Sequence, residues 1–202
     1  MADNAQILEL STPLGRVLFG NILFVVCCAF YLSWWVLRFR PGNPIVGLRS
    51  GWLLLPAAVA GLAAVVFILW GVTIAQPVRR LFPNVIILVG WIVGFILLIG
   101  ITYWLFDRPV TSELFLFTGW AALALAEVNT LYGSTLFSRT LAAILIAVVA
   151  VITLANLVCY ILYYRLGSAA SFIDGMIPLL LTGIFMIAVS ICMAASSRLS
   201  PG

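Results

Sequence analysis

Long apolar stretches separated by short polar breaks run through the whole chain. Six of these stretches have about the 20 residues that a helix needs to cross a hydrocarbon core of roughly 30 Å. Proline and glycine mark the breaks, for example at Pro41, Gly42 and Pro109, and proline resists continuing a helix. The predicted spans cover about residues 17–37, 52–75, 84–106, 112–132, 141–164 and 173–195. The pattern predicts an all-α integral membrane protein, a six-transmembrane-helix bundle with short loops.

The fourth stretch is the most polar of the six. It contains Glu113, Thr118, Glu127, Asn129 and Thr130, although residues 114–126 between the two carboxylates are compatible with a span. The alternative is five spans and a re-entrant segment. We expect six, which places both termini on the same side of the membrane.

The predicted organisation is one membrane domain with short ends. Residues 1–16 form an N-terminal arm, either interfacial or disordered, residues 17–195 form the six-helix domain, and residues 196–202 form a tail. Within the arm, Thr12 followed by Pro13 predicts a helix start, because a hydroxyl side chain caps and proline suits the first turn.

Composition supports the same class. Hydrophobic residues make up 65% of the 202, and only ten basic and six acidic residues are present, too few to cover a globule in water. We expect a multi-pass protein of a bacterial inner or plasma membrane. The positive-inside rule gives no orientation, because six spans divide the ten arginines five against five. One side receives Arg16, Arg79, Arg80, Arg139 and Arg198.

Missing residue types exclude several chemistries. The chain has no histidine and no lysine, which rules out a Schiff base, a Ser–His or Cys–His catalytic pair, and histidine-based haem or zinc sites. The four cysteines lie inside apolar runs without C-x-x-C spacing, as expected for small buried hydrophobes. The arginines form no basic cluster for nucleic acid. We therefore expect no catalytic residues, no metal and no cofactor.

Glu127 is the ionisable residue that needs the most explanation. Its neighbours include Ala124, Val128 and Leu131, and apolar surroundings disfavour the charged form of a carboxyl group. Intramembrane acids of this kind commonly bind and release protons in transport. The alternatives are an ion pair with an arginine and a neutral, hydrogen-bonded carboxyl group. Asp174 is expected at the start of the last helix, where a carboxylate stabilises the positive helix end.

Neutral polar residues recur at helical spacing and add further candidates. Such stripes must face protein or water, because lipid offers no hydrogen-bond partner. They indicate either hydrogen bonds between helices or the lining of a cavity. The predicted substrate- or proton-binding residues are Glu127, Asn156, Tyr160, Thr153, Trp120, Asn21 and Asp174.

Small residues predict close helix packing. Gly90 and Gly94 form a G-x-x-x-G motif in the third stretch, and Ala57 with Gly61 is a similar pair in the second. A third set consists of Ala143, Ala147 and Ala150. Such faces allow helices to approach closely, either within the chain or between copies. We expect packing within the chain, with oligomer contacts as the alternative.

The function expected from these observations is transport. The leading hypothesis is a small transporter or channel for a small neutral or cationic solute, with polar stripes lining an internal cavity and the bilayer as its surroundings. The alternative is an accessory or assembly subunit that binds another membrane protein, and a membrane-embedded lipid-modifying enzyme is a third. A homo-oligomer is compatible with each.

Overall fold

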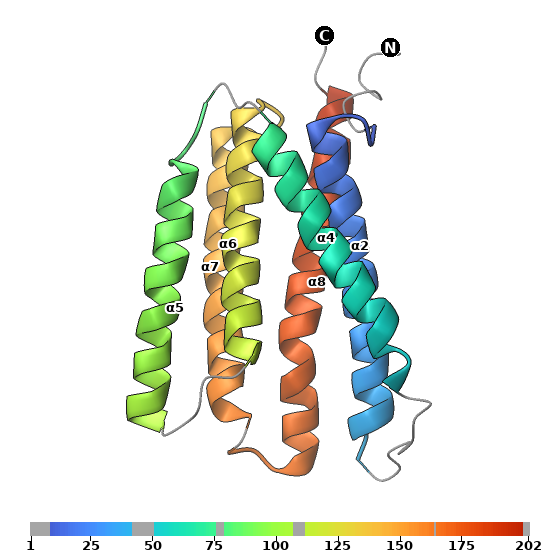
Figure 1. Ribbon diagram of the computed structural model, residues 1–202, viewed down its shortest axis with the longest axis vertical. Coiled ribbons are helices and arrows are strands. Elements are labelled where there is room, and N and C mark those ends of the chain that lie inside the picture. The colour runs from blue at the N-terminus through green and yellow to red at the C-terminus, as the bar shows by residue number, and fades with distance from the viewer. Residues whose placement is uncertain (1–8, 42–50, 76–78, 107–111, 164, 200–202) are drawn as a thin grey trace. The chain divides into compact units, whose positions relative to one another are not determined.

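The protein is built from helices throughout the part of the chain that the structure describes. The computed structural model describes residues 9–41, 51–75, 79–106, 112–163 and 165–199. Figure 1 shows the helices, and all six are long and apolar enough to cross a membrane. They are α2 (Pro13–Phe39), α4 (Leu54–Ile74), α5 (Asn84–Phe106), α6 (Ser112–Gly133), α7 (Arg139–Leu162) and α8 (Ser168–Leu199). The prediction of an all-α, multi-pass membrane protein with six spans is confirmed.

The first helix begins where its capping sequence predicts. Thr12 is the N-cap, and its hydroxyl oxygen accepts a hydrogen bond of 3.0 Å from the backbone N–H of Gly15. Pro13 is the first residue of α2, where its missing N–H has no intrahelical partner in any case. Most of the predicted N-terminal arm, residues 1–8, lies outside the described residues.

The last helix begins earlier than the apolar pattern indicates. α8 starts at Ser168, so Asp174 lies six residues inside it and the first turn contains no acid. The interpretation of Asp174 as a residue opening the helix is therefore wrong. Pro178 follows within the same helix, and because proline has no N–H it cannot donate the usual bond to the carbonyl of Asp174.

The chain divides into two compact units, which we describe separately. The terminal unit contains both ends of the sequence and consists of α2, α4 and α8, whereas the central unit consists of α5, α6 and α7. In the terminal unit, α2 packs against both α4 and α8. α2 begins and α8 ends at the same end of this unit (Figure 1), as an even number of spans requires.

Glycine and alanine hold α2 and α4 close together. A Cβ added at Gly71 would lie 2.6 Å from the carbonyl oxygen of Pro13, and one at Gly20 would lie 2.6 Å from Ile68. The small residues predicted to pack in the second stretch include Ala57, which is 2% exposed. Close packing is therefore confirmed for α4, where van der Waals contact between helices provides the stabilisation.

Aromatic and basic residues mark the two ends of the terminal unit. The Arg16 guanidinium lies 4.2 Å from the centre of the Trp70 ring at one end, and Trp35 contacts Phe39 with ring centroids 4.4 Å apart at the other. The 19 residues from Arg16 to Trp35 rise by about 28 Å in a helix. This distance matches a hydrocarbon core of roughly 30 Å, with the rings at the headgroup levels.

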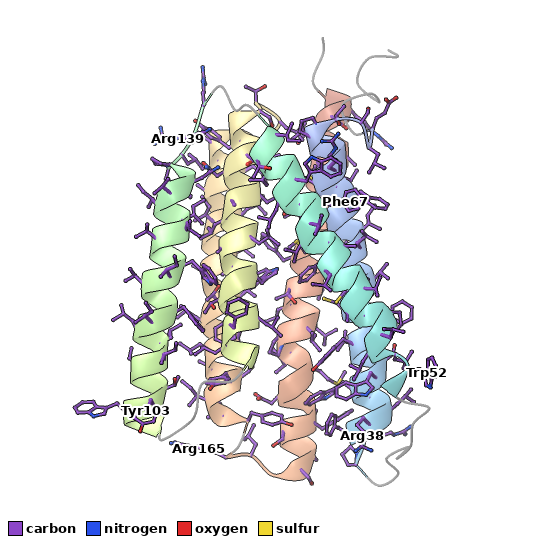
Figure 2. The ribbon with its side chains drawn as sticks, viewed as in Figure 1. Arg38, Trp52, Phe67, Tyr103, Arg139 and Arg165 are labelled. Atoms are coloured by element: carbon purple, nitrogen blue, oxygen red, sulfur yellow. The ribbon has the colours of Figure 1, made fainter. Side chains whose placement is uncertain are left out.

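In the central unit, α6 is the most buried of the three helices. It packs against both α5 and α7, and 67% of its apolar span is buried, compared with 6% for α5. α6 and α7 are joined by a tight turn in which Thr135 has a φ of 64° and the N–H of Phe137 donates to the carbonyl of Leu131. Arg139 marks one end of this unit and Tyr103 the other (Figure 2).

The glycines of α5 make no close contacts with the other described residues. A Cβ added at Gly90 or Gly94 would meet no atom within 4 Å, and α5 exposes large side chains such as Ile96 and Leu97 along its length. Within the central unit, the expectation that this G-x-x-x-G face packs against another helix is therefore wrong. The alanines of the predicted third set are exposed as well, namely Ala143, Ala147 and Ala150.

Candidate functional site

The seven predicted site residues fall into two groups. Five belong to the central unit, with Trp120 and Glu127 on α6 and Thr153, Asn156 and Tyr160 on α7. The other two belong to the terminal unit, with Asn21 on α2 and Asp174 on α8.

The two residues of the terminal unit do not form one site. Asp174 precedes Gly175, which is packed against the ring of Trp35 near the end of α2. Asn21 is 14 residues before Trp35 in the same helix, which corresponds to about 21 Å along its axis. Both side chains are buried, but they lie near opposite ends of the unit.

The central unit brings its polar residues together along the contact between α6 and α7. Phe117 and Tyr160 face each other with ring centroids 6.2 Å apart, which sets the register of these antiparallel helices. Trp120 lies about one turn after Phe117, and Asn156 lies about one turn before Tyr160. Trp120 and Asn156 are therefore at the same level, 5% and 1% exposed.

Trp120 and Glu127 lie on the side of α6 that faces away from α5. Thr118 faces α5, because its hydroxyl accepts a hydrogen bond of 3.4 Å from the indole N–H of Trp91. Residues two positions apart in a helix point about 200° apart, so Trp120 points the opposite way. Glu127 is seven residues after Trp120 on the same face, about 10 Å along the axis, and its side chain is fully buried.

Thr153 contributes less than the other residues of α7. Its hydroxyl donates a hydrogen bond of 2.7 Å to the carbonyl of Val149 in its own helix, and its side chain is half-buried. A hydroxyl bonded in this way has no proton left to offer a ligand, although its oxygen remains an acceptor. Thr153 could therefore only accept a hydrogen bond from a ligand.

Asn129 joins α6 to the start of α5. Its amide nitrogen donates to the carbonyl of Phe82 at 2.9 Å and to the side-chain oxygen of Asn84 at 3.0 Å. Its amide oxygen accepts from the backbone N–H of Leu81 at 2.9 Å. Sequence reasoning did not identify this role, because the partners are mostly backbone groups 45 to 48 residues away. The side chain of Asn129 therefore has a structural role, because its amide nitrogen and its amide oxygen both form hydrogen bonds.

The side chain of Asn156 differs from that of Asn129 in its hydrogen bonding. Its side chain is 1% exposed, yet neither its amide oxygen nor its amide nitrogen has a hydrogen-bond partner within the described parts of the chain. Burying an amide without partners costs about 1–3 kcal/mol, and nearly all buried polar groups in folded proteins are paired. Both faces of its chemistry, donor and acceptor, remain available to a bound molecule.

The candidate site offers groups suited to hydrogen bonding. The described residues contain no group of three or more His, Cys, Asp or Glu side chains placed to hold a metal ion. The four cysteines are free thiols, of which Cys28 and Cys159 are buried. The candidate site residues of the central unit supply the amide of Asn156, the carboxyl group of Glu127 and aromatic rings.

Comparison with known proteins found no relative: no protein-family model matches the chain, and neither the curated proteins nor the solved structures include a match. The site is therefore interpreted from its own residues.

Proposed function

We propose that this protein is a small multi-pass transporter or channel for a small neutral or cationic solute, which binds along the contact between α6 and α7. The observation that carries the proposal is the amide of Asn156, buried without a hydrogen-bond partner in the described part of the chain. We further propose that the membrane is a bacterial inner membrane or a plasma membrane.

A polar solute is the simplest source of the missing hydrogen bonds. Binding sites for small molecules are mostly apolar, with a few polar groups that fix the ligand's orientation. The surroundings of Asn156 fit this description, since Trp120 lies at its level and the Phe117–Tyr160 contact lies one turn away. A transported solute should also bind weakly enough to leave, which one amide and a few rings allow.

Glu127 extends the proposal to proton-linked or cationic transport. It is fully buried on the same face of α6 as Trp120, about 10 Å further along the helix. A carboxyl group in this position is suited to exchange a proton or to attract a cationic solute. It is the second polar group along the proposed route.

Solute flux through reconstituted vesicles tests the proposal. Purified protein in liposomes is mixed with a hyperosmotic pulse of urea, acetamide, glycerol or ethylammonium, and light scattering follows the recovery of vesicle volume. We expect at least one solute to enter faster than into protein-free liposomes, and Asn156→Leu to abolish the difference. Identical recovery with and without protein for every solute contradicts the proposal.

The glycines of α5 favour a second candidate, an accessory subunit that binds another membrane protein. Gly90 and Gly94 leave open space on a helix whose span is only 6% buried, and a partner helix would fit closely there. This candidate predicts no solute flux, and it predicts that Gly90→Leu releases a partner from the protein purified in mild detergent. Measured flux with an unaffected composition of the purified complex favours the transporter.

A further inference from the structure

The hydrogen-bonding pattern of Asn156 restricts which ligands fit. An asparagine side chain presents one carbonyl oxygen and one NH₂ group side by side in a plane. Both atoms lack partners among the described residues, and the side chain is 1% exposed. A flat ligand group that satisfies both needs a hydrogen-bond donor, such as an N–H, directly beside an acceptor oxygen. A ligand with only one of these leaves the other atom of Asn156 buried without a bond, which carries the full desolvation penalty.

The helices α6 and α7 have no charged residue at the level of Asn156. The facing stretches 117–125 of α6 and 152–160 of α7 include no acidic or basic residue. An ionic ligand at this level would be buried without a counter-charge, which is strongly unfavourable. The acidic residues of these two helices closest in sequence to Trp120 are Glu113 and Glu127, each seven residues away, which is about 10 Å along the axis of α6. The level of Asn156 therefore favours a neutral ligand.

The surrounding side chains favour a flat ligand with a short apolar part. Phe117, Tyr160 and Leu114 form a buried cluster one turn away, against which Leu157 and Ile161 pack. Trp120 lies at the level of Asn156 on the neighbouring helix. Planar groups pack well on aromatic faces, and a small apolar substituent would be removed from water against the cluster.

We infer that the site around Asn156 binds a neutral carboxamide or urea group, held by a pair of hydrogen bonds to the oxygen and nitrogen of the Asn156 amide. This inference rests on the proposed function and names the substrate class of the same site. The ligand's N–H donates to the Asn156 oxygen, and the ligand's carbonyl accepts from the Asn156 nitrogen.

Four small molecules of nearly the same shape test the inference. Acetamide offers a donor and an acceptor, acetone and acetate offer acceptors only, and acetamidinium offers donors only. Ligand-observed NMR titration of the full chain in nanodiscs, with empty nanodiscs subtracted, gives each dissociation constant. Acetamide has so few atoms that its dissociation constant should be about millimolar. We expect acetamide, and urea as its competitor, to bind at least about tenfold more tightly than the other three.

Two variants connect this preference to Asn156. Asn156→Leu should bind acetamide about tenfold more weakly and no better than acetone. Ser190→Ala is the control, because the Ser190 hydroxyl donates to the carbonyl of Met186 within α8, in the other unit. It should bind all four molecules as the wild type does. If Asn156→Leu does not fold, the order in which the four molecules bind to the wild-type protein still tests the inference.

The inference and the proposed function fail in different ways. Equal binding of acetamide and acetone, or no binding of acetamide, overturns the carboxamide inference. In that case the flux of another solute that depends on Asn156 would still support a transporter. Absence of flux for every solute overturns the proposed function, whatever the order of binding.

Discussion

The terminal and central units differ in how their membrane-spanning helices pack. In the terminal unit, α2 and α4 approach so closely that Gly20 and Gly71 have no room for a side chain. In the central unit, a Cβ added at Gly90 or Gly94 of α5 would meet no described atom within 4 Å, and α6 buries polar side chains such as Asn129 and Glu127. Close packing suits a rigid scaffold, whereas buried polar groups are expensive in a membrane protein and call for a role.

Within the central unit, two buried asparagines differ in their hydrogen bonds. Asn129 and Asn156 are both 1% exposed, but Asn129 uses its donors and acceptor to hold residues 81–84, and Asn156 has no partner in the described residues. The same residue type at the same burial therefore differs in its hydrogen bonding. The difference shows that hydrogen-bond partners, and not burial alone, distinguish a structural amide from a candidate ligand-binding amide.

The largest expected loss of stability follows substitution of the structural asparagine, Asn129. Asn129→Leu removes three hydrogen bonds of 2.9–3.0 Å and leaves the backbone groups of Leu81 and Phe82 without their partner. We expect it to lower the free energy of unfolding by about 3 kcal/mol. Asn84→Ala, which removes one of these bonds, should lower it by about 1 kcal/mol. Denaturant unfolding in detergent micelles measures both, and a stable Asn129→Leu protein would remove the contrast between the two amides.

The next largest expected effect is a difference in stability between glycine variants of the two units. Gly71→Ala places a methyl group 2.6 Å from the Pro13 carbonyl oxygen and from Val17, so it should destabilise by about 1–3 kcal/mol. Gly90→Ala has open space and gains helix propensity, so it should be neutral or stabilising by less than about 1 kcal/mol. Thermal unfolding of both variants provides the measurement. If Gly90→Ala is the more damaging change, the α5 face is occupied and the comparison between units is wrong.

The smallest expected effect on stability is at Glu127. Glu127→Gln keeps the shape and the hydrogen-bonding capacity of the side chain but cannot ionise, so it should change the free energy of unfolding by less than about 1 kcal/mol. If the carboxyl group exchanges a proton during transport, the variant should lose the pH dependence of uptake. Uptake and melting temperature are measured on the same preparation. A large loss of stability with unchanged uptake across pH would indicate a structural ion pair instead.

Much of the fold could be predicted from sequence because membrane spans depend on local composition. The Thr12–Pro13 helix start and the six apolar spans follow from capping and from helix length alone. The start of α8 was missed, since Ser168 to Ser171 are too polar to belong to an apolar run. The grouping of Asn21 with the residues of α6 and α7, and the packing of Gly90, also could not be judged, because which helices are neighbours is a tertiary property.

For the candidate site, too, properties local to one helix could be predicted, whereas contacts between helices could not. Helical spacing placed Asn156 and Tyr160 on one face of α7, and Trp120 and Glu127 on one face of α6. Their shared level depends on the Phe117–Tyr160 contact, which sets the register between the helices. No sequence pattern shows that Asn129 is paired and Asn156 is not, because pairing depends on the backbone of distant residues.

The free energy of unfolding of Asn156→Leu, measured beside its solute flux, tests the central claim most directly. Leucine has nearly the shape of asparagine and removes the buried amide that lacks partners in the described residues. If Asn156 serves ligand binding, the variant should be more stable than the wild type by about 1–3 kcal/mol while its solute flux falls to the level of protein-free liposomes. A variant that is less stable than the wild type, or one that keeps wild-type flux, would contradict the account.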